Sequence, residues 1–160
     1  MTAVAPDPTA ETLADGRYEL GDVLGRGGLA VTRRAFDRRL NREVAIKSLA
    51  ALEHREKFVR EAQALARFDH PGIVRVYEVF EDAGTAHLVM ELLDGRSVAA
   101  ELVARGGPLL ADEATALASG VGRALTVVHA AGLLHRDVSP SNVVLVADGR
   151  GGRRPVLIDF

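Results

Sequence analysis

The feature that most constrains the fold is a series of short extended runs separated by turn residues. Three runs follow one another between residues 18 and 50, and Gly-rich or Asp/Asn/Arg turns separate them. Short apolar-alternating runs joined by such turns are typical of an antiparallel meander. Residues 73–82 and 85–93 flank another turn and extend the pattern as a hairpin. The first half of the chain therefore predicts five antiparallel strands.

One helix interrupts the strands, and helices dominate the second half. Residues 52–72 end at a His-Pro-Gly breaker and carry four apolar residues on one helical stripe: Phe58, Ala62, Leu65 and Phe68. After Asp94, residues 97–106 predict a short helix and residues 111–132 a longer one. The apolar face of the longer helix comprises Ala114, Leu117, Val121, Ala124, Leu125 and Val128. Two short β runs, 142–150 and 155–160, follow, so the predicted fold class is α+β.

Composition excludes several classes of function. A chain of 160 residues that is 48% hydrophobic can fill the core of one ordinary domain. Its 20 basic and 22 acidic residues are spread along the chain, which argues against a nucleic-acid or membrane surface. The absence of cysteine excludes disulfides and thiolate zinc sites. We expect a cytoplasmic segment without membrane contact, preceded at residues 1–16 by a flexible leader.

Several residues carry the pattern of a phosphate site. Gly25, Gly27 and Gly28 lie between two predicted strands, where backbone N–H groups can approach a phosphate, although an ordinary Gly-rich hairpin turn is the better explanation of the glycines taken alone. Lys47 ends an alternating strand and, taken alone, is best explained as an ordinary lysine whose ammonium group lies in solvent. Glu61 on the following helix could hold that ammonium towards a phosphate, but a charged helix contains glutamates in any case.

A second set of residues suits a metal ion. Asp137 and Asn142 lie five apart in a polar loop, and Asp159 follows an apolar β run. Asn and Asp oxygens suit Mg²⁺, which takes few protein ligands and completes its shell with phosphate and water. A further carboxylate could accept a hydroxyl proton. Capping and turn chemistry remains the alternative explanation for each residue taken singly.

Taken in order, these segments resemble the protein kinase signature over residues 17–160. The set is LGRGG, VAIK, the helical Glu, HPGIV, LVMELLDGRS, HRDVSPSN and IDF. The proline of HRDVSPSN resembles serine/threonine rather than tyrosine kinases, and LGRGG with FVREAQALARFDHPGIV is similar to bacterial eukaryotic-like (Hanks-type) kinases. The resemblance implies a protein-kinase-like fold. Residues 17–93 would form an N-lobe of five strands and one helix, and residues 94–160 a hinge and the first, mainly helical part of a C-lobe.

The resemblance also implies roles for individual residues. Lys47 would contact the α and β phosphates of ATP with Glu61 as its ion-pair partner, and Asp137 would be the catalytic base towards a Ser or Thr hydroxyl of a protein substrate. Asn142 and Asp159 would hold Mg²⁺. The adenine pocket would comprise Leu24, Thr32, Ala45 and Val144, with Met90 as gatekeeper and the backbone of Glu91 and Leu93 at the adenine edge. His135 would be scaffolding, and Arg136 would pair with a phosphorylated activation loop.

Three departures from the family pattern bear on activity. Ala30 replaces the third glycine, and Ser139 replaces a lysine that neutralises the transferred phosphoryl group, a loss that costs several kcal/mol of barrier unless another group substitutes. The sequence stops at Asp159-Phe160, so we expect a truncated, inactive fragment of a kinase domain. The alternative is a nucleotide-binding, pseudokinase-like module without catalysis. Small-molecule phosphotransferases of related fold usually show HGD and lack HPGIV.

Overall fold

The computed structural model describes residues 11–50, 52–149 and 151–160, which form two compact units. The first unit runs to Ala66 and resumes at Val76–Leu92. The second comprises Arg67–Arg75 and Leu93–Phe160. The predicted division after residue 93 differs from this one mainly in residues 67–75, which belong with the second unit. In the described part of the chain, no helix is both long and apolar enough to cross a bilayer.

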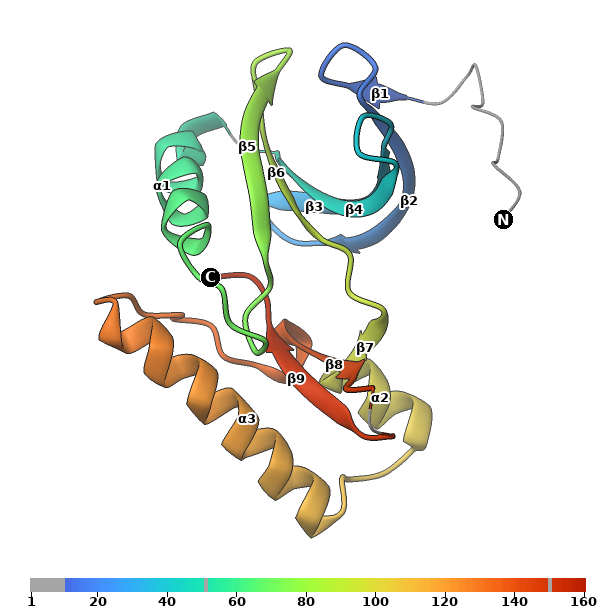
Figure 1. The fold of residues 1–160 in the computed structure, drawn as a ribbon, viewed down its shortest axis with the longest axis vertical. Helices are drawn as coiled ribbons and strands as arrows, with labels where there is room; N and C mark the ends of the chain where they lie inside the picture. Colours follow the sequence, from blue (N-terminus) through green and yellow to red (C-terminus); the bar gives the residue numbers. More distant parts are fainter. Residues whose placement is uncertain (1–10, 51, 150) are drawn as a thin grey trace. The chain divides into compact units, whose positions relative to one another are not determined.

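The first unit is built on a six-stranded antiparallel sheet in the order β1-β2-β3-β4-β6-β5 (Figure 1). Its strands are β1 (Thr12–Leu13), β2 (Tyr18–Arg26), β3 (Ala30–Asp37), β4 (Arg42–Leu49), β5 (Val76–Asp82) and β6 (Thr85–Glu91). Five of them are the predicted strands, although β5 starts three residues later than expected. The sixth, β1, lies inside residues 1–16, which were predicted to be a flexible leader. Residues 1–10 of that leader lie outside the described residues.

Strand β1 forms because its residues find both hydrogen bonds and apolar contacts. Leu13 pairs with Tyr18 of β2. Leu13 and Ala14 pack against the core cluster on one face of the sheet, which contains Tyr18, Leu20, Ala35, Val44, Ile46 and Val89. The backbone N–H of Ala14 also donates to Asp82 Oδ2 at 2.6 Å. A two-residue strand gives too short a period to be recognised in the sequence.

The helix between the strands is shorter than predicted. A 3₁₀ turn, η1 (Leu52–His54), leads into α1 (Arg55–Leu65), which buries Ala62 and Leu65 and lies beside β5 (Figure 1). Phe68, predicted on the same stripe, lies beyond the helix and packs against the core of the second unit. The chain leaves the helix before Pro71, whose ring is incompatible with a continued helix.

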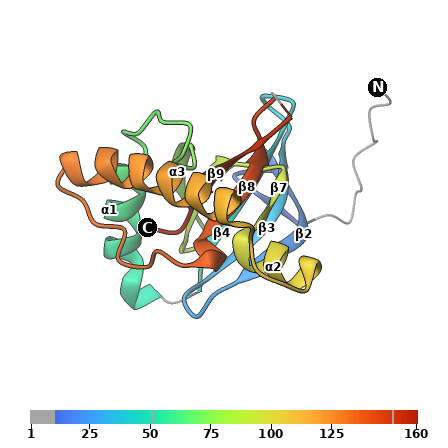
Figure 2. The ribbon, with the colours of Figure 1, turned by 90° about the horizontal axis from the view of Figure 1, so that it is seen from below.

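The second unit combines a three-stranded sheet with two helices. The sheet has the order β7-β8-β9, with β7 (Gly95–Ser97), β8 (Val143–Ala147) and β9 (Arg153–Leu157). The helices are α2 (Val98–Arg105) and α3 (Ala111–Ala130), with a 3₁₀ turn, η2 (Pro140–Asn142), before β8. Helix α3 lies along β9 in both views (Figures 1 and 2). Strand β7 was not predicted.

A local side chain explains where α2 begins. Ser97 ends β7 and caps α2, because its Oγ accepts the backbone N–H of Ala100 at 3.1 Å.

The core of this unit contains Ile73, Val98, Ala124, Val128, Val143, Leu145 and Leu157. The predicted apolar face of α3 is largely confirmed, but Ala114 is exposed.

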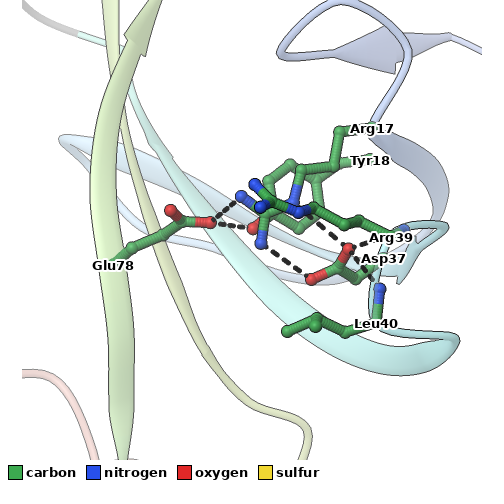
Figure 3. Close-up of polar contacts among 6 residues, drawn as sticks. All are labelled: Arg17, Tyr18, Asp37, Arg39, Leu40 and Glu78. Atoms are coloured by element: carbon green, nitrogen blue, oxygen red, sulfur yellow. Dashed lines mark hydrogen bonds and ion pairs between the residues drawn. The ribbon is translucent and has the colours of Figure 1, made fainter.

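A polar cluster joins the start of β2 to the end of β3 in the first unit (Figure 3). The fully buried Asp37 carboxylate accepts hydrogen bonds from Arg17 Nε at 3.2 Å and Arg17 Nη2 at 3.0 Å. It also accepts the backbone N–H groups of Arg39 and Leu40. Arg17 Nη1 lies 2.8 Å from Glu78 Oε1, which also accepts the Tyr18 hydroxyl. Burial alone would raise the pKa of Asp37, but the hydrogen bonds and charge of Arg17, with those from Leu40 and Arg39, lower it overall.

An ion pair joins α2 to α3 and gives the second unit an acid-sensitive contact. Glu113 accepts hydrogen bonds from both terminal nitrogens of Arg105, that from Nη2 at 2.8 Å, and from the backbone N–H of Leu110 at 2.9 Å. These contacts lower the pKa of Glu113 from 4.5 to about 2, the bond from Arg105 contributing most. Because the pKa is lower in the folded than in the unfolded chain, this stabilisation is complete above pH 4.5 and is lost as the pH falls towards 2.

We therefore expect the Glu113 side-chain carboxyl carbon to titrate in NMR spectra with a midpoint near pH 2. Replacing Arg105 with glutamine removes the main cause, so the midpoint in that variant should rise towards the ordinary glutamate value. A midpoint near pH 4.5 in the unchanged chain would contradict the contact.

Candidate functional site

The register of the first sheet gathers residues of the predicted phosphate site in one row. Gly25 of β2 lies opposite Thr32 of β3, Thr32 opposite Lys47 of β4, and Lys47 opposite Leu88 of β6. Directly opposed residues of antiparallel strands share a face of the sheet. The glycine strand, the threonine and the lysine therefore lie on one face, and Leu88, which the sequence reasoning missed, joins them.

A second row on the same face contains residues of the predicted adenine pocket. Ala45 lies two residues before Lys47 and opposite Met90 of β6. The side chains of Ala45, Met90 and Leu88 are all buried. The core residues Val44 and Ile46 alternate with them and point to the other face. The alternation in TAHLVME would have identified Leu88 together with Met90.

The glycines between β2 and β3 are not required by the fold itself. None of Gly25, Gly27 and Gly28 has a positive φ. A Cβ atom at Gly25 or Gly28 would meet nothing within 4 Å among the described residues, and one at Gly27 would make ordinary contact with the Ala30 carbonyl at 3.7 Å. Gly27 N–H donates to that carbonyl at 2.9 Å. Neither backbone strain nor crowding explains three glycines here, which leaves close approach by another molecule as a physical reason.

The remaining predicted residues of the first unit are placed as follows. Leu24 is exposed on β2, and Glu91 ends β6 opposite Val44. Ala30, in the position of the third glycine, is buried as the first residue of β3, so its methyl group is accommodated by regular strand geometry. Glu61 lies on α1 with Oε1 3.8 Å from Lys57 Nζ. The ion pair between Lys47 and Glu61 stays a prediction.

In the second unit, Asp137 and Asn142 are in direct contact. Asn142 Nδ2 donates to Asp137 Oδ2 at 2.8 Å and to the Asp137 backbone carbonyl at 3.0 Å. The backbone N–H of Asn142 donates to the Ser139 carbonyl at 3.0 Å and closes the turn at η2. Because its amide nitrogen is directed to Asp137, Oδ1 is the atom of Asn142 that a cation would contact.

The same loop is tied to the segment that carries Asp159. The backbone N–H of Ile158 donates to the Asn142 carbonyl at 3.0 Å. The buried His135 bridges the two segments, since its Nε2 donates to the Ile158 carbonyl at 3.0 Å and its Nδ1 accepts the Asp137 N–H at 3.4 Å. The ring of His135 also lies 4.3 Å from that of Phe160. These contacts bring the loop of Asp137 and Asn142 next to the segment that carries Asp159, while the predicted roles of the three residues stay predictions.

Two residues of this neighbourhood have left-handed backbone conformations. Arg136 has φ 65° and Asp159 has φ 58°. Positive φ is uncommon outside glycine and costs energy, which the surrounding hydrogen bonds must offset. These two residues change the direction of the backbone immediately before Asp137 and at Asp159 itself. The other non-glycine residues with positive φ in the described part of the chain, Ala14, Asp15, Asn41 and Ala83, lie in turns.

The donor set fits a cation that uses few protein ligands. Asn142 and Asp159 supply an amide oxygen and a carboxylate, and the described residues contain no group of three or more His, Asp or Glu side chains able to hold a metal ion. This set matches Mg²⁺, which completes its octahedron with phosphate and water, better than a metal held entirely by protein.

The two residues of the predicted adenine pocket that belong to the second unit are Val144 and Leu93. Val144 of β8 lies opposite Ser97 and Val156, and Leu93 is the first residue of its segment in the second unit.

Comparison with known proteins identifies the family. A family profile described as the protein kinase domain matches residues 18–160. A probable serine/threonine-protein kinase of Streptomyces coelicolor is 44% identical over 144 residues, which cover 84% of this chain and 21% of that protein. The serine/threonine-protein kinase PknB of Mycobacterium leprae is 39% identical over 140 residues, covering 82% of this chain and 22% of that protein.

Solved structures agree. The kinase domain of Mycobacterium tuberculosis PknI, a double mutant, superposes with a TM-score of 0.81 at 30% identity and covers 99% of this chain and 62% of that one. The chain spans about a fifth to a third of the length of its curated relatives. The chain thus belongs to the protein kinase domain family, as a bacterial Hanks-type serine/threonine kinase domain.

Proposed function

We propose that these residues bind Mg-ATP and supply the catalytic base for phosphoryl transfer to Ser or Thr hydroxyls of a protein. The observation that carries the proposal is the contact network of Asp137, Asn142 and the segment Ile158–Phe160 in the second unit. In this network the exposed Asp137 carboxylate contacts Asn142, and the loop is bonded to the segment that carries Asp159. Asn142 and Asp159 carry oxygen atoms of the kind that Mg²⁺ prefers, which supports the proposal.

The first unit supports the nucleotide part of the proposal. Lys47 lies on one face with Gly25 and Thr32, so an ammonium and the backbone at Gly25 would meet the same phosphates. The buried Ala45 and Met90 would offer an apolar surface to adenine. Leu24, Gly27, Gly28 and the backbone of Glu91 would extend this surface within the first unit. Val144 and Leu93 of the second unit are further adenine contacts that the family resemblance implies.

Chemical roles follow from the donor atoms. Asp137 would accept the hydroxyl proton, and Asn142 would orient Asp137 through its amide while presenting Oδ1 to the metal ion. Bound Mg²⁺ would neutralise charge on the phosphates. Glu61 would hold Lys47 if the predicted ion pair forms. Ser139 provides no cation here, so transfer is expected to be slower than with lysine at that position.

Nucleotide binding is tested by calorimetric titration of the chain with Mg-ADP. Lys47→Ala removes a charge-assisted contact to phosphate and should weaken binding by about tenfold or more. Lys57→Ala changes the only other lysine of the chain and should leave the affinity nearly unchanged. Asp159→Asn should abolish the gain in affinity that Mg²⁺ provides, whereas Asp112→Asn should not. Equal affinities for all variants would overturn the site.

Transfer is tested separately, because the relatives are several times longer than this chain. In a full-length protein containing these residues, Asp137→Asn should reduce transfer of radiolabelled phosphate to protein by several orders of magnitude while leaving Mg-ADP affinity intact. Undiminished transfer would remove Asp137 as the base. Binding without transfer in the unchanged protein would favour a nucleotide-binding module without catalysis.

A further inference from the structure

A buried histidine lies in the first unit, outside the proposed site. His87 of β6 is only 4% exposed. Its Nδ1 lies 2.8 Å from Ser48 Oγ of β4, so the two side chains join neighbouring strands. Its ring stacks on Phe80 of β5 with centroids 5.0 Å apart, and Phe80 stacks on Tyr18 at 5.5 Å. His87 is therefore the end of a column of three stacked rings inside the core.

One nitrogen of this ring is not satisfied. His87 Nε2 is buried and has no hydrogen-bond partner of normal geometry among the described residues. In the neutral ring the unsatisfied atom costs the desolvation of one polar group. In the protonated ring both nitrogens carry hydrogens, and the buried charge costs considerably more, because the charge and backbone of Asp82 offset only part of the lost hydration.

The charged groups on the same face do not remove this cost. Burial lowers the pKa of His87, and Asp82 of β5 opposes the shift through its charge and backbone carbonyl without reversing it. The Asp82 carboxylate already accepts the Ala14 N–H. On the same face, Glu78 engages Tyr18 and Arg17, Arg17 engages Asp37, and Arg33 engages Glu11. Arg42, opposite Asp37, lies over the ring of Tyr77.

We propose that His87 makes the first unit sensitive to pH, because protonation of its buried ring loosens the joint between β4 and β6. The sign follows from proton binding. The unfolded chain takes up a proton near pH 6.5, whereas the folded chain takes it up only at lower pH. The unfolded state thus binds more protons below pH 6.5, so the stabilisation is complete above this pH and declines below it, by up to about tenfold in the unfolding constant per pH unit until the folded ring titrates.

Tyrosine fluorescence isolates the unit concerned. The chain has no tryptophan, and its two tyrosines, Tyr18 and Tyr77, both lie in the first unit. Urea unfolding of the whole chain, followed by this signal at pH 7.5 and 5.5, compares three proteins: the unchanged chain, His87→Phe and His54→Phe. His87→Phe keeps an aromatic ring in the column and cannot be protonated. His54 belongs to the same unit, its side chain is 43% exposed, and it serves as the matched control.

We expect the unfolding constant of the unchanged chain and of His54→Phe to rise several-fold more than that of His87→Phe when the pH falls to 5.5. The same pH dependence in all three proteins would overturn the proposal. If His87→Phe does not fold, NMR titration of the His87 ring in the unchanged chain decides. A midpoint below 6.5 supports the proposal, and a midpoint at or above 6.5 overturns it.

Discussion

Replacing Asp37 with alanine is expected to destabilise the first unit by about 3 kcal/mol, since removing one partner of a buried ion pair leaves the other uncompensated. The Asp37 side chain is fully buried, while Arg17 is 23% exposed and can recover part of its hydration. The change also leaves the backbone N–H groups of Arg39 and Leu40 without their acceptor (Figure 3). Because Arg17 can recover part of its hydration, the expected loss lies near the lower end of the range for buried ion pairs.

Urea unfolding followed by tyrosine fluorescence measures this loss. Asp22→Ala removes an exposed carboxylate of β2 and should change the free energy of unfolding by less than about 0.5 kcal/mol. The pKa of Asp37 is lowered in the folded chain, so its contribution is present above pH 3.8 and disappears as the pH falls through the folded value. Asp37→Ala should lose this part of the acid sensitivity. A loss no larger than that of Asp22→Ala would contradict the assigned role.

The first sheet shows how far the sequence could predict the fold. Five strands followed from alternation and turn residues, because each strand is long enough to display its period. Strand β1 has two residues, and its position depends on contacts of Leu13 and Ala14 with a core formed by later segments. Strand β7 likewise has three residues and pairs with β8, almost fifty residues further along the chain. Neither strand carries a local signal.

Phe68 illustrates a different limit. Helical spacing placed it on the stripe of Ala62 and Leu65, but its partners are residues of the second unit. Periodicity states which residues share a face only while the helix continues, and α1 ends at Leu65. The sequence shows a helix breaker at Pro71, but α1 ends six residues earlier and Phe68 packs against the core of the second unit.

The candidate site was predictable in its residues and less so in its contacts. The spacing of Asp137, Asn142 and Asp159 in the sequence identified them as candidates. In the structure, hydrogen bonds of Ile158 and His135 connect the loop of Asp137 and Asn142 to the segment of Asp159. The backbone bonds of Ile158 have no sequence signature, since any residue can form them. The left-handed conformation of Asp159 is likewise invisible in the sequence, because glycine is the residue that such a backbone favours.

Gly120→Ala is expected to destabilise the second unit by about 2 kcal/mol, because overpacking a filled contact costs 1–3 kcal/mol. A Cβ atom at Gly120 would lie 2.4 Å from Pro155 Cγ and 2.9 Å from Cδ. The proline ring is rigid and belongs to the edge strand β9, where its lack of an N–H is tolerated. Helix α3 and β9 must therefore separate, which disturbs the core around Ala124 and Leu157.

Gly122 provides a matched control on the same helix. A Cβ atom there would meet nothing within 4 Å, so Gly122→Ala should stabilise α3 by up to about 1 kcal/mol through helix propensity. Hydrogen exchange of amides in α3, β8 and β9 reports on the second unit, which contains no tyrosine. Combining Gly120→Ala with Pro155→Ala removes the opposing ring and should restore much of the lost protection relative to Pro155→Ala alone. If the cost of Gly120→Ala is the same with and without Pro155, the close approach of α3 to β9 is not its cause.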